Sequence, residues 1–240
     1  MFRQRAKIWG RMAFDLAKTW KERVHRAEAL QNKCRDIIEK LQLPGDDARV
    51  LGISRVGGRC STLAELPLRL FDEAESIGGH ARLKKGLRYR SVDDVHTVLS
   101  DLTYDARLAF VAITQFVLED CVESVLDAIP NEKKRGGFSK SVRRLMQVTN
   151  LEDPDTKYEI LMVPAWIRNS LHAVGIHNGG RKSVDIDGAQ YVFEKGERVA
   201  CGSWEHILHA YDHGLDIYGE MLCSPTVRAI TRIPAKKHPC

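Results

Sequence analysis

No apolar run in this 240-residue chain reaches the roughly 18 residues that a membrane-spanning helix requires. We therefore expect a protein that has no membrane association. The six cysteines include no CxxC pair, and this argues against a zinc ribbon and against a dense disulfide framework. We expect reduced thiols and a cytoplasmic location.

The signature motifs of several enzyme classes are also missing. The chain contains no GxxxxGKS or GxxxxGKT, no GxGxxG after a strand, no HExxH and no GxSxG. Their absence argues against P-loop, dinucleotide-binding, zincin and α/β-hydrolase sites. Aromatic residues make up only 7% of the chain and do not interleave with its basic segments, so base stacking of the RRM type is not expected.

The composition that remains is that of a folded globular protein. Hydrophobic residues make up 43% and charged residues 29%, which excludes a wholly disordered chain. The length fits one large domain or a small pair. The formal net charge of +5 is mildly basic and compatible with a nucleic-acid partner.

Hydrophobic residues keep helical spacing through much of the chain. Over residues 1–45 this spacing predicts one long amphipathic helix that runs unbroken until Leu43-Pro44-Gly45. The Arg-rich, acid-free start at residues 1–14 is also typical of an organelle transit peptide or a membrane-surface helix. The continuation of the pattern past Asp15 and Glu22 favours a packing helix, which would dock on its own domain or on a second copy.

Residues 46–90 are predicted to form a mixed connecting region, with a short strand from Arg49 to Val56. Ser91 and Asp94 then open a strong helix that continues to residue 129. Another helix is predicted to end near Asn150.

Three further segments complete the predicted order. Asp153 and Pro154 start a helix for which Gly175 is the C-terminal cap. Turns at Asp187-Gly188 and Lys195-Gly196 predict a small β-hairpin over residues 184–199. A last helix begins after Ser203, and residues 223–240 are expected to be a basic, frayed tail. The predicted fold class is therefore all-α, a bundle of about five helices with a β-hairpin insert before the last one.

Two basic segments are candidates for contacts with an RNA backbone. They lie within residues 82–90 and 131–144, and solvated loops are the alternative interpretation. The candidate residues are Lys84, Lys85, Arg88, Lys133, Lys134 and Arg135.

The most informative polar residues stand near the end of the helix that starts at Asp153. Arg168 and His172 are four residues apart, so their Cβ atoms should lie about 5 to 6 Å apart, and Asn169 lies on the same side. A neutral His can take the proton of a ribose 2′-hydroxyl, and an Arg can stabilise charge on phosphoryl oxygens. The alternative is a structural Arg and His that bond carbonyls or a neighbouring acid.

The run Arg168-Asn169-Ser170-Leu171-His172, followed by His177-Asn178-Gly179, a hairpin and a last helix, resembles the HEPN superfamily (higher eukaryote and prokaryote nucleotide-binding domains). The resemblance covers about residues 153–222, with the helix at 91–129 as a bundle partner. It implies a homodimeric, metal-independent endoribonuclease, without cofactor, in defence or toxin systems, with RNA and a cognate regulatory protein as partners.

Arg168, Asn169 and His172 are the catalytic residues that this resemblance implies, and His177 is the second histidine candidate. The family usually places four to six residues between the Arg and the His, whereas three separate Arg168 from His172 and eight separate it from His177. A non-catalytic helical dimer that binds a nucleotide or assembles with proteins therefore remains the alternative function.

The last helix carries a second polar group. His206, His209 and His213 share one face, and three imidazoles within two turns could hold zinc or nickel. Histidines also commonly decorate polar helix faces, and we expect this surface role and no metal.

Overall fold

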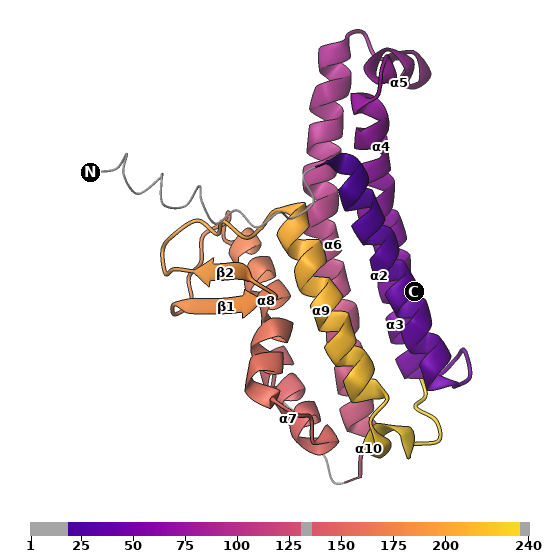
Figure 1. Cartoon of the computed structure of the whole chain (residues 1–240), viewed down its shortest axis with the longest axis vertical. Coiled ribbons are helices and arrows are strands. Elements are labelled where there is room, and N and C mark those ends of the chain that lie inside the picture. The colour runs from indigo at the N-terminus through magenta and orange to yellow at the C-terminus, as the bar shows by residue number, and fades with distance from the viewer. Residues whose placement is uncertain (1–18, 131–135, 236–240) are drawn as a thin grey trace.

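The computed structural model describes residues 19–130 and 136–235, most of them in helices (Figure 1). In chain order the elements are α2 (Trp20–Leu41), α3 (Ala48–Arg59), a π-helical turn (Cys60–Glu65), α4 (Leu66–Glu75), α5 (Gly79–Leu87), α6 (Val92–Ala128), α7 (Phe138–Thr149), α8 (Pro154–His172), β1 (Lys182–Ile186), β2 (Ala189–Phe193), α9 (Trp204–Leu222) and α10 (Pro225–Arg228). This confirms a mostly helical fold with a β-hairpin before the last long helix. The helices outnumber the five that we expected.

Helix α6 is the element against which most others pack. Its start confirms the predicted capping box, because Asp94 N–H donates to Ser91 Oγ at 3.0 Å and Ser91 N–H donates to the Asp94 carboxylate at 2.9 Å. With 37 residues it spans about 55 Å at 1.5 Å per residue. Helices α3, α4, α5, α7 and α8 all contact it.

The first described helix begins later than expected. Thr19 has extended backbone angles and caps α2 in a reciprocal pair with Glu22, so the helix expected from residue 2 does not run unbroken through residue 19. A threonine three residues before a glutamate is a strong helix start, and here it outweighs the continuous apolar spacing. Residues 1–18 lie outside the described part of the chain.

The region 46–90 is helical rather than a mixed connector, and the strand predicted from Arg49 to Val56 is wrong. Val50, Ile53 and Val56 are buried along one face of α3. Their spacing of three is helical, but β-branched residues favour strands, and this preference led to the wrong prediction. The α3 backbone also lies very close to α6, since a Cβ built on Gly52 would stand 2.8 Å from the Cys121 sulfur. Only glycine permits that approach.

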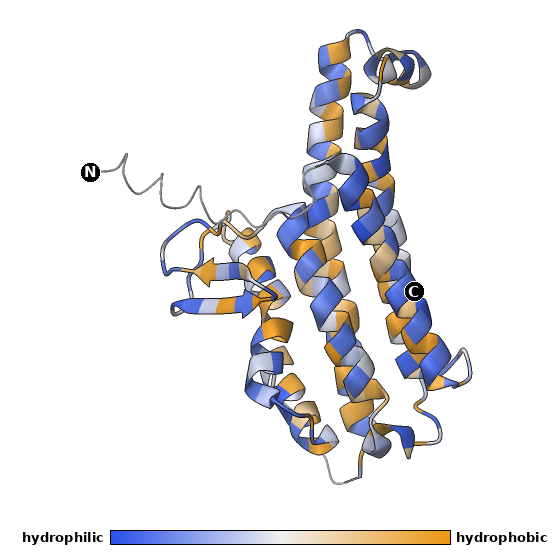
Figure 2. Cartoon of the chain, in the orientation of Figure 1, coloured by the Kyte–Doolittle hydropathy of each residue, from blue (hydrophilic) through white to orange (hydrophobic). Residues whose placement is uncertain are grey.

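The hairpin is shorter than expected and has neighbours on both sides. Its strands cover residues 182–193 and are antiparallel, with the Asp187-Gly188 turn as predicted. Residues 196–199 leave the hairpin and pair instead with the loop after α8, where His177 N–H donates to the Glu197 carbonyl at 3.0 Å. Hydrophobic and hydrophilic residues alternate around the long helices (Figure 2), as expected where each buries one side in a shared core.

The tail is not frayed within the described residues, which reach position 235. Residues 225–228 form α10, and Ile233 pairs through its backbone with the start of α3: Ala48 N–H donates to the Ile233 carbonyl at 2.8 Å. Ile233 and Val227 are buried. Their burial supplies the hydrophobic stabilisation that the basic composition of this segment did not predict.

A fully buried ion pair joins the start of α3 to the C-terminal segment. Arg49 and Asp47 have no exposed side-chain surface and lie 2.8 Å apart. The Arg49 guanidinium also donates to the Val227 and Ile230 carbonyls, and the Asp47 carboxylate accepts from Ile233 N–H at 3.0 Å. Burial raises the pKa of Asp47, but the hydrogen bonds from Arg49 and Ile233 outweigh it and leave that pKa below its usual value.

We expect Asp47→Ala to lower the free energy of unfolding by about 3 to 5 kcal/mol, because it leaves a buried guanidinium without its counter-charge. Urea denaturation measures this, with Asp47→Asn as the milder variant. The neighbouring Asp46→Ala is the matched control. It removes an exposed pair with Arg232 and should cost less than about 1 kcal/mol. Equal losses from the two variants would contradict the role of the buried pair.

Candidate active site at the end of helix 8

The predicted Arg-Asn-His group lies in the last turns of α8. The helix ends at His172, and Gly175 N–H donates to the Ser170 carbonyl at 2.8 Å. Val174 and Gly175 are both left-handed, with φ of 57° and 81°. The C-cap is therefore Ala173 and not Gly175 as predicted, although the Gly175 N–H still satisfies a carbonyl of the last turn, and the chain turns sharply just after His172.

The Arg168 side chain has as neighbours Glu119 and Phe116 on α6 and Asn169 on its own helix. Its side chain is 15% exposed, and its Nη1 lies 3.6 Å from a Glu119 carboxylate oxygen. Its Nε and Nη2 donate long hydrogen bonds, 3.4 and 3.3 Å, to Asn169 Oδ1, and its guanidinium carbon lies 5.3 Å from the centre of the Phe116 ring. Nη1 is buried and makes no hydrogen bond with the described residues, so its polar contact is the ion pair with Glu119.

His172 and Asn169 are exposed next to Arg168 on the same helix. The structure gives the His172 ring no hydrogen bond or ion pair with any described residue, so both of its nitrogens remain open to solvent or to a ligand. Arg168, Asn169 and His172 are therefore neighbours, as the helical spacing predicts.

His177 has a different environment. Its side chain is buried, Nδ1 lies 3.3 Å from Ser170 Oγ and Nε2 lies 3.0 Å from the Gly180 carbonyl oxygen. The ring packs on Phe193 and leaves no room for a side chain at Gly179, where a Cβ would stand 2.9 Å from it. Both ring nitrogens already have partners, so His177 anchors the loop that follows α8.

A hollow of about 290 Å³ lies between the end of α8 and this loop. Its lining includes Asn169 and the Lys182 side chain, whose ammonium lies 5.7 Å from the Trp166 ring. Lys182 is a cation that sequence reasoning missed; it lines this hollow with Asn169, whereas Arg168 and His172 are not among the lining residues. It stands in β1 without a motif around it, so only the folding of the hairpin onto α8 reveals it.

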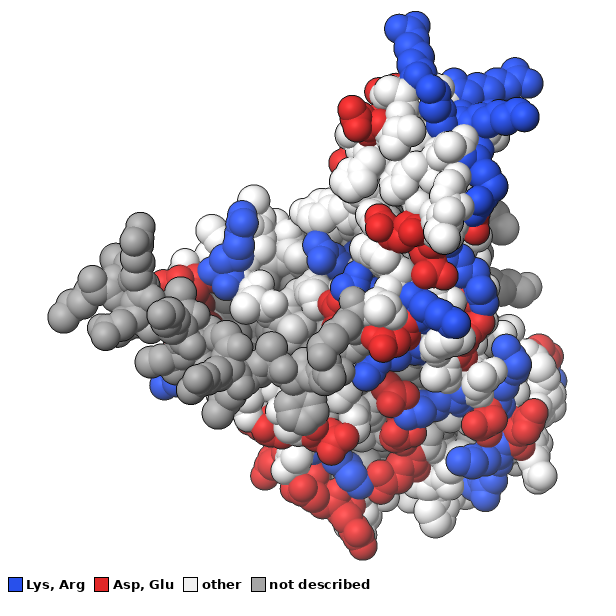
Figure 3. All heavy atoms as spheres, turned by 45° about the horizontal axis from the view of Figure 1, so that its top comes forward, with Lys and Arg blue, Asp and Glu red and all other residues white. Residues whose placement is uncertain are grey.

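The basic candidates lie away from this group or outside the described residues. Several Lys and Arg side chains project from the end of the molecule that α5 occupies (Figure 3). Lys85 and Arg88 are exposed there and Lys84 is partly exposed. Helix α5 stands beside His96, whereas Arg168 stands beside Phe116, twenty residues or about 30 Å further along α6. Lys133, Lys134 and Arg135 lie outside the described residues.

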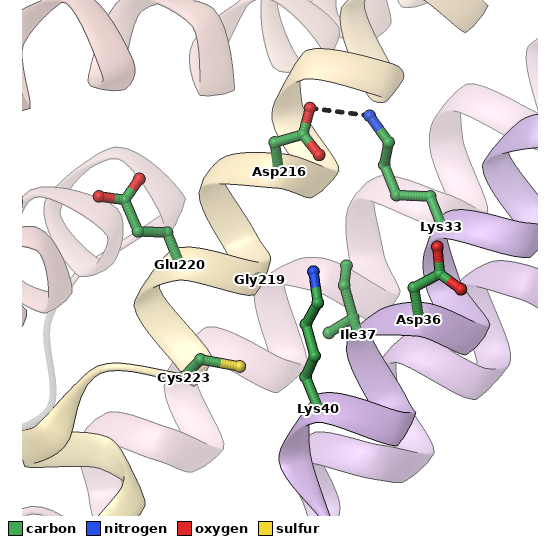
Figure 4. A pocket seen from close by; sticks show the side chains of 8 residues that line it. All are labelled: Lys33, Asp36, Ile37, Lys40, Asp216, Gly219, Glu220 and Cys223. Carbon is green, nitrogen blue, oxygen red and sulfur yellow. Dashed lines mark hydrogen bonds and ion pairs between the residues drawn. The ribbon is translucent and has the colours of Figure 1, made fainter.

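A second hollow, of about 350 Å³, is lined by residues of α2 and α9 (Figure 4). Its charged groups are largely paired with each other or with neighbours. Lys33 bonds Asp216 and Asp212 at 2.7 Å, and Glu220 bonds Lys157 at 2.7 Å. This pairing leaves little net charge for a ligand, so the α8 site is the stronger candidate.

The histidines of α9 do not form one surface row. His206 turns to Ser203, with Nδ1 2.8 Å from Oγ. His209 is buried and its Nδ1 lies 2.9 Å from the Tyr191 hydroxyl oxygen. Burial lowers the pKa of His209 to about 4, with His213 and Arg26 acting in the same direction and Asp212 and Asp187 opposing them. His209 is therefore neutral at neutral pH and does not decorate a polar face.

Comparisons of the chain with protein-family models, with curated proteins and with solved structures gave no match. Within the described residues, no helix combines the length and the apolar character needed to cross a membrane. The site is therefore interpreted from its own geometry and from the sequence resemblance.

We expect the two histidines of the motif to differ in stability effect. His177→Ala should lower the free energy of unfolding by about 1 to 3 kcal/mol, because it removes a buried, doubly hydrogen-bonded ring. His172→Ala should change it by no more than about 0.5 kcal/mol, since that ring is exposed. Chemical denaturation of both variants measures the difference. A larger loss from His172→Ala would contradict the assignment.

Proposed function

We propose that this chain is a HEPN-like, metal-independent endoribonuclease whose site consists of Arg168, Asn169 and His172. The observation that carries the proposal is a largely covered guanidinium, held by Glu119 and Asn169, next to an exposed imidazole on the next helical turn. A covered cation interacts strongly with an anion because little water screens it. A phosphodiester supplies that anion, and the ribose supplies the hydroxyl on which the imidazole acts.

The residues divide the reaction between them. His172 in its neutral form accepts the proton of the 2′-hydroxyl as its oxygen attacks the adjacent phosphorus. Arg168 stabilises the negative charge that grows on the phosphoryl oxygens. The P–O5′ bond breaks, the 5′-oxygen receives a proton, and the products are a 2′,3′-cyclic phosphate and a free 5′-hydroxyl. Asn169 and Glu119 hold the guanidinium in position.

The positive groups around the site would act on the RNA backbone. Lys182 stands at the wall of the hollow that Asn169 also lines. Lys84, Lys85 and Arg88 would contact only an RNA long enough to follow α6 towards α5. Such contacts release counterions, so binding should weaken as salt increases.

RNA cleavage in the presence of EDTA tests the proposal. We expect mixed RNA to be cut to products with 2′,3′-cyclic phosphate ends. The rate should fall about 10²- to 10⁴-fold in His172→Ala and about 10²- to 10³-fold in Arg168→Ala. His25→Ala, which changes an exposed histidine of α2, is the control and should cut at the original rate. Cleavage that persists in both site variants would overturn the assignment of these residues.

A second candidate function has its own supporting observation. Phe116, beside Arg168, is 57% exposed, and Val174, just after His172, is 78% exposed. Exposed apolar residues clustered next to a polar group are typical of a protein–protein interface. We infer a homodimer in which two copies of the Arg168 site approach each other, and a cognate regulatory protein would compete for the same surface. A purely structural dimer would form this interface without cutting RNA.

Phe116→Glu tests the dimer. The substitution replaces an apolar contact of the interface with a charge that would have to be desolvated, and it should halve the molar mass measured by light scattering. Ile77→Glu is the matched control, because Ile77 is fully exposed between α4 and α5 and should leave the mass unchanged. A monomeric wild-type chain, or a Phe116→Glu variant that stays dimeric, would contradict this interface.

A further inference from the structure

A group of metal-ligand side chains lies where the turn of the hairpin meets α9. Asp187 comes from the β1–β2 turn, and His209 and His213 stand one turn apart on α9. One ligand atom from each lies within 4.8 Å of the others. The hairpin turn is the end of the hairpin that lies nearest α9 (Figure 1). His206, the third histidine of this helix, is not a member.

The hydrogen bonds of Tyr191 decide which nitrogen of His209 is free. The tyrosine hydroxyl donates its single proton to the His206 carbonyl at 2.8 Å. At 2.9 Å from His209 Nδ1 it can then only accept, so Nδ1 carries the proton of the neutral ring. Nε2 is left as a lone pair without a partner among the described residues. Metal-binding histidines are generally oriented in this way by a bond to their other nitrogen.

The carboxylate comes from Asp187 because its neighbours are already used. Asp185 accepts from Gly188 N–H at 2.8 Å and from the Gln190 amide. Asp212, next to His213, binds Lys33 at 2.7 Å. Within the described residues the Asp187 carboxylate makes no hydrogen bond or ion pair. Its backbone is left-handed, with φ of 47°, a conformation that aspartate tolerates in a two-residue hairpin turn.

We propose that Asp187, His209 and His213 bind a divalent transition-metal ion, Zn²⁺ in preference to Mg²⁺ or Ca²⁺, and that the ion fastens the hairpin turn to α9. Two imidazoles and one carboxylate suit zinc, whereas magnesium and calcium prefer oxygen ligands. Ligands of a tetrahedral zinc site lie about 3.3 Å apart. The ligand atoms, now within 4.8 Å of one another, therefore need to approach by up to about 1.5 Å, which the exposed Asp187 and the half-buried His213 can do.

Three protein ligands leave a fourth position for water. The ion would join two segments that are otherwise linked through Tyr191, and its binding free energy would add to the stability of the fold. This site is separate from Arg168 and does not enter the proposed RNA cleavage. None of the contacts from which the metal site is inferred involves Arg168, Asn169 or His172.

Titration of Zn²⁺ into the full-length, tag-free chain by calorimetry tests the site. We expect one ion per chain, and Zn²⁺ at 100 times its Kd should raise the Tm by about 5 to 10 °C. Asp187→Asn and His213→Ala should each weaken binding at least about tenfold, which at the same Zn²⁺ concentration reduces the Tm shift to about half or less. Both residues are at least partly exposed, so these variants should fold.

Two further variants make the assignment specific. His206→Ala should bind Zn²⁺ as the wild type does, because that ring bonds Ser203 instead. Tyr191→Phe should weaken binding about 10- to 100-fold through loss of the bond that orients His209. Absence of binding by the wild type, unchanged affinity in Asp187→Asn or His213→Ala, or loss of binding in His206→Ala would each overturn the site.

Discussion

The buried Arg49–Asp47 pair is the interaction on which the arrangement of this chain depends. A guanidinium without access to water is costly unless every donor and the charge itself find partners. Here the partners come from the start of α3 and from the carbonyls of Val227 and Ile230, 178 and 181 residues later in the chain. Satisfying this one charge therefore holds the C-terminal segment, which follows α9, against the start of α3.

The hairpin organises both candidate sites through one strand. Tyr191 and Phe193 are two residues apart in β2 and are both buried, as alternation in a strand requires. Phe193 packs on His177 and Trp166, which shapes the loop beside Arg168. Tyr191 packs on His206 and bonds His209, which orients the group on α9. A disturbance of β2 would therefore affect the two sites together, although Phe193 stands at the open end of the hairpin and Asp187 in its turn.

Sequence patterns predicted the long helices and the hairpin well, because their signals are local. The Ser91–Asp94 capping box and the Asp187-Gly188 turn are examples, and each depends on residues within a few positions. The region of residues 46–90 was the main failure. Its helices are short, α3 carries the β-branched Val50, Ile53 and Val56, and glycines interrupt the region, so their stability comes from packing on α6 rather than from propensity. The close contact of Gly52 with Cys121 joins residues that no local pattern relates.

The candidate site divides in the same way. The sequence by itself determined that Arg168, Asn169 and His172 share one side of a helix end, because helical periodicity sets the positions of residues three and four apart. Only the tertiary structure decided that Glu119 and Phe116 flank Arg168, that His177 is a buried anchor, and that Asp187 rather than His206 joins His209 and His213. Those relations depend on which segments pack together, and packing is set by the burial of the whole chain rather than by the spacing within any one segment.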